Sequence, residues 1–247
     1  MPRALVTYFQ SKYQPVLEFV LSRLTHYAKK CNAVLETIKI RDDSIDPQMD
    51  KFFHIGDNFA QYDQIAVVDV DILIRKDAPD IFSWVGPNRI GVYNEGATHL
   101  NSFGHNRDEE TIRWVTVAQM IKLCNLPPIP LNKSGSWDNP FFYFNSGVVV
   151  LGQKHREIYS NFTPLERDNC YANARKVQCS EQALVNYSLF KCGFPIVSLP
   201  NCFNQMAYNR DSNYLDTAFF SHYAGMPIEE KFKQMVSDHK KWESWGY

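Results

Sequence analysis

Two aspartates, Asp69 and Asp71, are separated by one residue and directly follow the apolar segment 64–68. A continuous apolar run of this length is typical of a buried strand, so the two carboxylates leave that strand at its carboxyl end. In open α/β sheets this edge is where ligands bind. Two carboxylates so placed can share a hard divalent cation such as Mg²⁺ or Mn²⁺, which also accepts phosphate oxygens. The alternative is a pair of solvated loop acids that cap a helix beginning near Pro79.

The elements that must position these acids alternate between short β-type runs and amphipathic helical segments. Strands are expected at 4–8, 33–40, 64–68, 90–93, 144–151, 195–199 and 218–221, and helices at 16–24, 50–59, 109–124, 181–190 and 229–242. The segments 94–108 and 131–139 are expected to be loops. This order predicts a single α/β domain of the Rossmann-like type, with a central, mostly parallel mixed sheet flanked by helices.

Composition and charge exclude several classes of protein. The chain has 247 residues, of which 45% are hydrophobic, and this is enough to bury one core. A formal net charge of -1 gives no positive field that would gather a nucleic acid, so no nucleic-acid partner is expected. Every apolar stretch is shorter than the roughly 20 residues of a membrane span, and residues 4–6 are too short for a secretory signal.

Cysteine usage points in the same direction. The six cysteines are scattered and form no Cys-x-x-Cys pair. This pattern fits neither a zinc site nor the disulfide framework of a small secreted domain. We therefore expect reduced thiols in a cytoplasmic protein.

Sequence landmarks on both sides of the aspartates extend the pattern over nearly the whole chain. In chain order they are residues 4–7 with Tyr13, Lys51 with 62–74 and 80–82, 144–148, 181–182 with Asn186, 199–200 with 203–204, and 222–225. With these six landmarks the chain resembles the family 8 glycosyltransferases, a group that includes glycogenin and bacterial lipopolysaccharide galactosyl- and glucosyltransferases. The segment 62–74, which contains both aspartates, is the strongest match, and 144–148 is similar to the family's Phe-Asn-Ser/Ala-Gly strand.

The resemblance implies a GT-A fold and an enzyme that transfers a hexose or pentose from a nucleotide-diphosphate sugar to an acceptor hydroxyl. A UDP-sugar is the expected donor, Mn²⁺ or Mg²⁺ the expected cofactor, and retention the expected outcome at the anomeric carbon. The implied metal ligands are Asp69, Asp71 and His222. The implied catalytic residues are Gln182, near the anomeric carbon, and Asn145 and Lys51, at the sugar hydroxyls. The implied nucleotide contacts are Thr7, Tyr13, Val70 and Gly225.

The resemblance also implies how the chain is divided. Residues 1–93 would form the nucleotide-binding half, 94–228 the donor-sugar and acceptor half, and 229–247 a C-terminal helix and tail. The acceptor would be a glycan, a lipid-linked glycan or a protein. The tail places Phe232, Met235, Val236 and Trp242 on one helical face beside several lysines, so it could contact an anionic membrane peripherally. Docking on its own domain is the alternative.

Two positions depart from the family pattern. The family usually has His-x-x-Gly-x-x-Lys-Pro-Trp, whereas Gly225 is followed here by Met-Pro-Ile, so the lysine that steadies the diphosphate is missing from its expected place. Lys231 or Lys233 is a possible substitute. Glu181 stands where the family has Asp.

Each functional interpretation has a structural alternative. His222 could be a satisfied core histidine, Lys51 a solvated helix charge, and the Asn145-Ser146-Gly147 segment a β-bulge. Thr7 and Tyr13 could serve in core packing, and Gln182 and Asn186, one helical turn apart, could merely face each other. At the level of function, the alternative to an enzyme is a catalytically inactive nucleotide-sugar or carbohydrate-binding module with the same fold.

Overall fold

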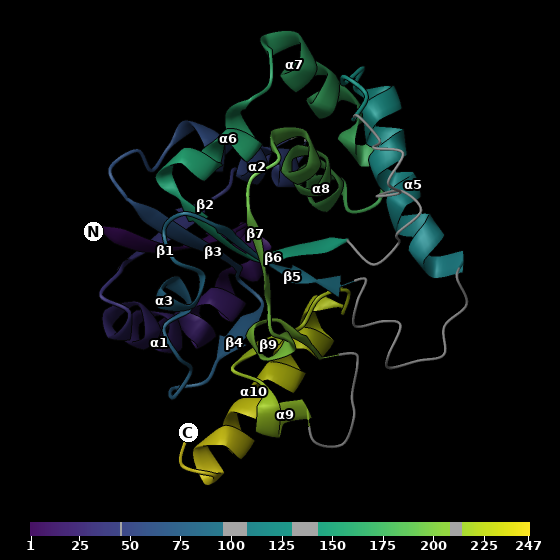
Figure 1. Ribbon diagram of the computed structural model, residues 1–247. Helices are drawn as coiled ribbons and strands as arrows, with labels where there is room; N and C mark the ends of the chain where they lie inside the picture. Colours follow the sequence, from purple (N-terminus) through teal and green to yellow (C-terminus); the bar gives the residue numbers. More distant parts are fainter. Residues whose placement is uncertain (45, 96–107, 130–142, 208–213) are drawn as a thin grey trace.

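The computed structural model describes residues 1–44, 46–95, 108–129, 143–207 and 214–247, and its centre is a six-stranded sheet (Figure 1). The strands lie in the order β2-β1-β3-β6-β5-β7. All of them run in one direction except β6, which is antiparallel to both of its neighbours. Their bounds are β1 (Arg3–Phe9), β2 (Val34–Lys39), β3 (Gln64–Asp69), β5 (Ile90–Asn94), β6 (Phe144–Gly152) and β7 (Ile196–Leu199).

Helices cover both faces of this sheet, because its central strands are apolar on both sides. Along β1, for example, Val6 and Tyr8 belong to the core on one face, and Leu5 and Phe9 to the core on the other. The first face is covered by α2 (Pro47–Asp57), α5 (Asp108–Leu123), α6 (Glu157–Ser160), α7 (Pro164–Asn173) and α8 (Ser180–Cys192). The second is covered by α1 (Gln14–Lys30), α3 (Ile81–Val85), α9 (Tyr214–Thr217) and α10 (Ile228–Ser244). The predicted α/β class is confirmed.

A second, smaller sheet joins the segment that follows the aspartates to a segment near the C-terminus. It has the order β4-β9-β8, with β4 (Ile72–Ile74), β8 (Gln205–Met206) and β9 (Phe220–His222). In the antiparallel pair of β4 and β9, Ile72 lies opposite His222. This register places the histidine beside Ile72, the residue that follows Asp71, although the two paired residues are 150 positions apart in the sequence.

The C-terminal helix docks on its own domain, as the alternative for the tail predicted. Met235 and Trp242 of α10 are fully buried, and Phe232 packs against the same core. The Trp242 indole Nε1 donates a hydrogen bond to the carbonyl of Leu215 at 3.1 Å. The buried Asp238 carboxylate accepts hydrogen bonds from two tyrosine hydroxyls of the domain. Phe232, Met235 and Trp242 of the predicted apolar face therefore pack inside the protein.

Most predicted elements are present, with shifted ends. The helix expected at 50–59 is α2, which starts earlier because Asp46 caps it, accepting hydrogen bonds from the backbone N–H groups of Gln48 and Met49. The strand expected at 218–221 is β9, which begins two residues later. The predicted loop at 131–139 and most of the one at 94–108 lie outside the described residues. Within the described ranges, no helix is both long and apolar enough to span a membrane.

Candidate metal site and the cavity around it

The three predicted metal ligands converge at the carboxyl edge of the central sheet. Asp69 is the last residue of β3, Asp71 immediately precedes β4, and His222 ends β9. The imidazole Nε2 of His222 lies 3.6 Å from Oδ2 of Asp69 and 3.5 Å from Oδ1 of Asp71. One potential ligand atom from each residue lies within 4.8 Å of the others. The alternative that the aspartates cap a helix is wrong, because the cap of α3 is Asp80.

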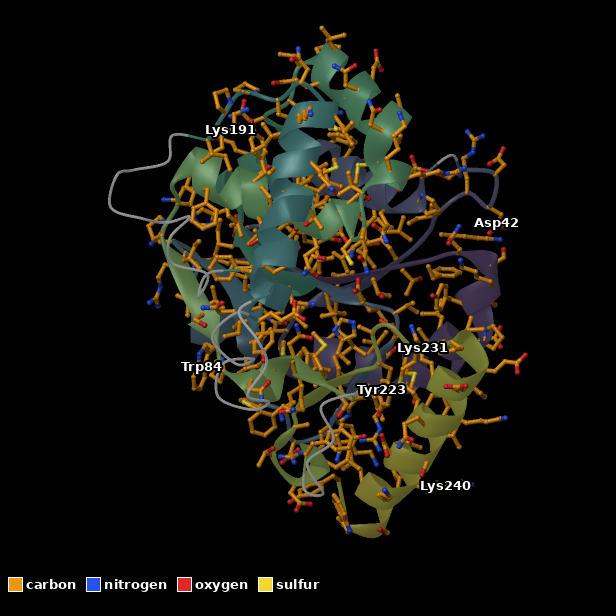
Figure 2. All side chains as sticks on the ribbon, turned by 90° about the vertical axis from the view of Figure 1, so that its right-hand side faces the viewer. Asp42, Trp84, Lys191, Tyr223, Lys231 and Lys240 are labelled. Carbon is orange, nitrogen blue, oxygen red and sulfur yellow. The ribbon has the colours of Figure 1, made fainter. Side chains whose placement is uncertain are left out.

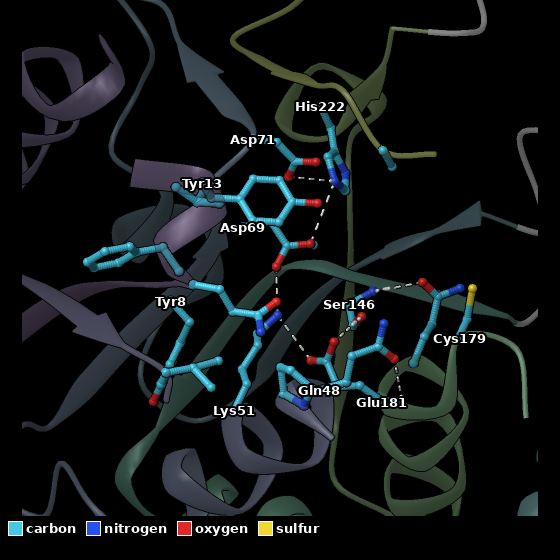
Figure 3. A pocket seen from close by; sticks show the side chains of 18 of the residues that line it. Tyr8, Tyr13, Gln48, Lys51, Asp69, Asp71, Ser146, Cys179, Glu181 and His222 are labelled. Atoms are coloured by element: carbon cyan, nitrogen blue, oxygen red, sulfur yellow. Dashed lines mark hydrogen bonds and ion pairs between the residues drawn. The ribbon is translucent and has the colours of Figure 1, made fainter. Parts of the chain in front are cut away.

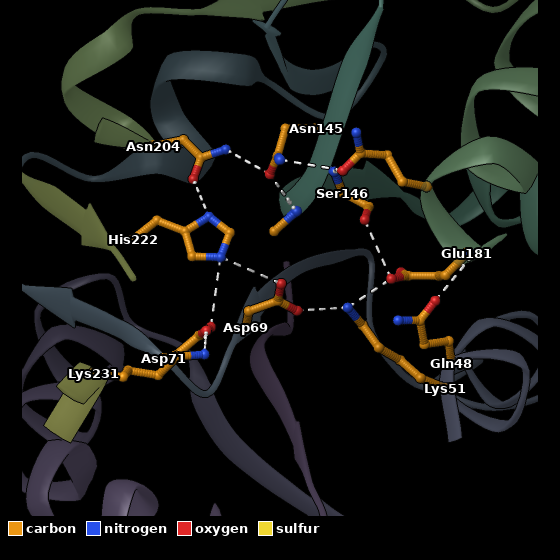
Figure 4. A network of polar contacts seen from close by, with 12 residues as sticks. Gln48, Lys51, Asp69, Asp71, Asn145, Ser146, Glu181, Asn204, His222 and Lys231 are labelled. Atoms are coloured by element: carbon orange, nitrogen blue, oxygen red, sulfur yellow. Dashed lines mark hydrogen bonds and ion pairs between the residues drawn. The ribbon is translucent and has the colours of Figure 1, made fainter. Parts of the chain in front are cut away.

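Two lysines approach the aspartates from opposite sides (Figure 4). The Nζ of Lys51, on α2, is 2.6 Å from Oδ1 of Asp69, and the Nζ of Lys231, on α10, forms an ion pair with Asp71. Both lysines are buried, so Lys51 is not the solvated helix charge of the structural alternative. Lys231 and Lys233 are the possible substitutes for the lysine that is missing after Gly225. Lys231 reaches the acidic pair, whereas Lys233 is exposed.

Burial and opposite charge compete in this cluster. At Asp71, burial favours the neutral carboxyl, but His222 and then Lys231 outweigh it and hold its pKa well below the usual range. At Lys51, burial favours the neutral amine, but Asp69 keeps its pKa above the ordinary value. Burial likewise disfavours the imidazolium of His222, yet its pKa is raised because Asp71 and then Asp69 attract a proton. Opposite charges therefore favour the charged forms of Asp71, Lys51 and His222.

Glu181, the departure from the family's Asp, joins this cluster from α8. Its Oε1 lies 3.1 Å from the Nζ of Lys51, and its Oε2 accepts a hydrogen bond of 3.2 Å from the hydroxyl of Ser146. Burial raises the pKa of the Glu181 carboxyl, although Lys51 opposes that shift. Lys51 is thus shared between two carboxylates, one on each side.

A cavity of about 470 Å³ opens over this cluster (Figure 3). The three predicted metal ligands line it, and so do six other predicted site residues: Tyr13, Lys51, Val70, Asn145, Gln182 and Gly225. Thr7 does not belong to the described lining. Its side chain is fully buried in β1, which fits its core-packing alternative, and the next residue, Tyr8, reaches the cavity instead.

The Asn145-Ser146-Gly147 segment is both a bulge and part of the cavity wall. The pairing of β5 with β6 shifts register between Val92 and Tyr93, opposite this segment, so the predicted bulge is present. Gly147 is needed for a close approach, because a Cβ there would lie 2.3 Å from Cε1 of His222 and 2.9 Å from Oδ1 of Asn145. The absence of a side chain at Gly147 leaves room for both the imidazole of His222 and the amide of Asn145.

Side-chain amides form the wall away from the aspartates. The Nδ2 of Asn145 donates a hydrogen bond of 3.1 Å to Oε1 of Gln182, and Nε2 of Gln182 donates one of 3.2 Å to Glu95. Asn186 binds the backbone carbonyls of Phe144 and Gln182 and the N–H of Phe144. The Asn186 side chain therefore fixes β6 against α8 through backbone groups, including the carbonyl of Gln182.

The acidic pair and the histidine have the right chemistry for a divalent cation. Carboxylate oxygens suit Mg²⁺ and Mn²⁺, and an imidazole nitrogen is a common additional ligand for transition metals such as Mn²⁺. The ligand atoms are close enough to meet one ion with small side-chain movements. The oxygens nearest His222 are Oδ2 of Asp69 and Oδ1 of Asp71, whereas Lys51 and Lys231 contact the other oxygen of each carboxylate. An ion beside the imidazole could therefore bind both aspartates while each keeps an oxygen for its lysine.

Comparison with models of known protein families finds no match, and comparison with curated protein sequences finds none either. Solved structures do match over almost the entire chain. One is a glycosyltransferase involved in the glycosylation of the major capsid of PBCV-1, with a TM-score of 0.54, 11% identity, and coverage of 96% of this chain and 100% of that one. This chain has the fold of a glycosyltransferase.

Two further structures agree. The galactosyltransferase LgtC in complex with donor and acceptor sugar analogues has a TM-score of 0.52 and 15% identity, with 95% of each chain covered. Mouse xyloside xylosyltransferase 1 has a TM-score of 0.50 and 14% identity, with coverage of 92% of this chain and 100% of that one. At these identities the comparisons establish the fold, and the family 8 assignment remains a prediction.

Three groups in the site carried no assigned role in the sequence analysis. Tyr8, the residue after Thr7, lines the cavity, and its hydroxyl lies 2.9 Å from Nδ1 of His54. Glu95 ends the amide row, and Asn204, known from the sequence only as a landmark, contacts His222. A strand-edge position was the available signal for Tyr8, while no sequence spacing marks the other two.

Proposed function

We propose that this protein is a metal-dependent glycosyltransferase that moves a sugar from a nucleotide-diphosphate donor to an acceptor hydroxyl. The observation that carries the proposal is the meeting of Asp69, Asp71 and His222 in the wall of the cavity, on a fold shared with glycosyltransferases. A bound Mn²⁺ or Mg²⁺ would supply positive charge for the diphosphate that leaves. We further propose a UDP-sugar as the donor and membership of family 8.

The donor's diphosphate is proposed to lie between the aspartates and α10. Lys231 can leave Asp71 for a phosphate oxygen, so it would take the part of the lysine missing after Gly225. Gly225 lines the cavity with a φ of 70°, a left-handed conformation that favours glycine and lets a ligand approach the backbone. Tyr13 also lines the cavity, with its ring centroid 5.3 Å from the Nζ of Lys231. These residues would bind and orient the nucleotide end.

The sugar ring is proposed to lie over the amide wall. Gln182 would present its side chain to the anomeric carbon, where positive charge develops as the bond to phosphate breaks. Asn145 and Lys51 would contact sugar hydroxyls, with Glu181 holding Lys51 in place. A carboxamide is a poor nucleophile, so we propose retention by attack of the acceptor on the same face, with the leaving phosphate taking the acceptor's proton.

The test is release of the nucleotide diphosphate from a panel of nucleotide sugars, with and without Mn²⁺ and with candidate glycan acceptors. We expect turnover of at least one UDP-sugar that needs the metal. Saturable binding of donors by calorimetry, with no turnover of any of them, would instead support the inactive binding module. Turnover that is indifferent to metal and to Asp71→Ala would contradict the proposed chemistry.

A further inference from the structure

The side of His222 that faces away from the aspartates contacts a buried amide. Its Nδ1 lies 2.9 Å from Oδ1 of Asn204, and both side chains are shielded from solvent, with Asn204 0% and His222 3% exposed. Asn204 follows the short helical turn Asn201–Phe203 and precedes β8, which pairs in parallel with β9. The small sheet thus brings the amide to the histidine.

The hydrogen-bond direction at this contact follows from a backbone group that can only donate. The N–H of Gly147 donates to Oδ1 of Asn145 at 2.8 Å, so that oxygen is an acceptor. The Nδ2 of Asn204 donates to the same oxygen at 2.9 Å. Turning the Asn145 amide around would set its Nδ2 against the N–H of Gly147, which is two donors, and turning the Asn204 amide around would set its oxygen against Oδ1 of Asn145, which is two acceptors. Asn204 therefore presents its oxygen to His222, and the Nδ1 of His222 must carry a hydrogen.

We propose that Asn204 is a positioning residue that holds the Nδ1–H form of His222, leaving Nε2 as the atom aimed at Asp69 and Asp71. This inference rests on the proposed metal site for its functional meaning. A histidine that binds a metal through one nitrogen commonly donates its other N–H to an oxygen, which fixes both ring orientation and tautomer. Asn204 would supply that oxygen.

The Asn204 amide also connects the proposed metal site to the amide wall of the cavity. Asn204 contacts His222 on one side and Asn145 on the other, and Asn145 in turn donates to Gln182. The row of amides from His222 to Gln182 has one consistent direction, and every step of it is set by the backbone N–H of Gly147. A substitution at Asn204 should therefore affect the positions of both His222 and Gln182 (Figure 4).

Two substitutions at Asn204 separate its contacts. Asn204→Leu is close in size and removes both hydrogen bonds, whereas Asn204→Asp keeps an acceptor for His222 and removes the donor to Asn145. The matched control is Asn201→Leu, because Asn201 is an exposed amide of the same turn that hydrogen-bonds to Gln205. Mn²⁺ binding in the presence of UDP is measured by electron paramagnetic resonance. We expect Asn204→Leu to bind Mn²⁺ about 10- to 100-fold more weakly, and the Asp and control variants to bind it nearly as the wild-type protein does.

The tautomer itself is read from ¹H–¹⁵N spectra of the metal-free protein at alkaline pH, where the imidazole is neutral. We expect the Nδ1–H form in the wild-type protein and in Asn204→Asp, and a shift toward the Nε2–H form in Asn204→Leu, because only the carboxylates then remain as acceptors. A merely structural role for Asn204 would leave the tautomer unchanged.

Two results would overturn the inference: an Nε2–H tautomer in the wild-type protein, or wild-type Mn²⁺ affinity and tautomer in Asn204→Leu. If Asn204→Leu does not fold, the wild-type spectrum still decides the matter. Failure of the proposed function looks different, since the wild-type protein itself would then bind no Mn²⁺, while its tautomer would still report on Asn204.

Discussion

The two ends of the cavity are built on different principles. At the charged end, Asp69, Asp71 and His222 lie among two lysines, and opposite charges hold the groups together. At the amide end, Asn145 and Gln182 carry no charge and are held by directional hydrogen bonds. In Figure 2, Lys231 and Lys240 lie on the same C-terminal helix, α10, but Lys231 is buried whereas Lys240 is exposed.

This difference suits the two ends to different tasks, which are binding of the metal and donor at the charged end and orientation of the reacting centre at the amide end. Charge interactions depend weakly on angle, so the charged end can accept a cation and a diphosphate without a change in its backbone. Hydrogen bonds between amides depend strongly on angle, so the amide end can hold a reacting centre in one geometry. We therefore expect substitutions at the charged end to act on metal and donor binding, and those at the amide end to act on turnover.

The largest effect is expected at Asp71, one of the three proposed metal ligands. Asp71→Asn keeps the size of the side chain and removes its charge, so metal-dependent release of the nucleotide diphosphate should fall by roughly a thousandfold, the equivalent of several kcal/mol of charge stabilisation. Asp216→Asn, at an exposed aspartate of α9, is the control and should behave as wild type. If the Asp71 variant were as active as the control, the charged end of the cavity would not have the metal-binding role proposed for it.

The next largest effect is expected at the amide end. Gln182→Ala removes the group proposed to face the anomeric carbon, so kcat should fall by about 100-fold. The affinity for Mn²⁺ with UDP should stay near the wild-type value, because Gln182 contacts none of the three proposed ligands. Steady-state kinetics and Mn²⁺ titration together check this split. A loss of Mn²⁺ affinity as large as the loss of kcat would show that the ends are not separable.

Gly147 lies at the boundary and should affect both ends. Gly147→Ala puts a methyl group against the imidazole of His222 and the amide of Asn145, so one of them must move. Overpacking of this kind costs about 1–3 kcal/mol of unfolding free energy. Urea unfolding measures the stability, and Mn²⁺ titration measures the displacement of His222. Unchanged stability combined with unchanged Mn²⁺ affinity would show that this close approach has no role.

The smallest effect is expected for the substitute cation. Lys231→Gln should raise the KM for the donor about tenfold, since a hydrogen bond to a charged group contributes about 1.5–3 kcal/mol. Lys233→Gln removes a charge two residues away on the exposed side of α10 and is the matched control. If the two variants raise KM equally, Lys231 acts through general electrostatics and not through a contact with the diphosphate.

The parts of the molecule that local pattern determines were predictable from the sequence. The apolar run of β3 with its two terminal aspartates, and the amphipathic face of α10, are local signals, and both elements are present. The strands β4 and β8 were not predicted, because they have three and two residues and exist only through pairing with β9.

The site shows the same division. The ligand set came from a resemblance between ordered motifs, and the structure brings those three residues together. The position of Lys231 depends on how α10 docks, and the contact of Asn204 with His222 depends on the small sheet. Neither has a spacing in the sequence that distinguishes it from an ordinary surface lysine or turn asparagine. Tertiary packing decides both.

The most direct test of the central claim is a crystal structure with Mn²⁺ and UDP, with the metal located by its anomalous scattering. We predict one Mn²⁺ bound by Asp69, Asp71 and Nε2 of His222, with the Nζ of Lys231 turned toward the diphosphate. A structure in which UDP fills the cavity and no metal lies beside His222 and the two aspartates would contradict the proposed chemistry.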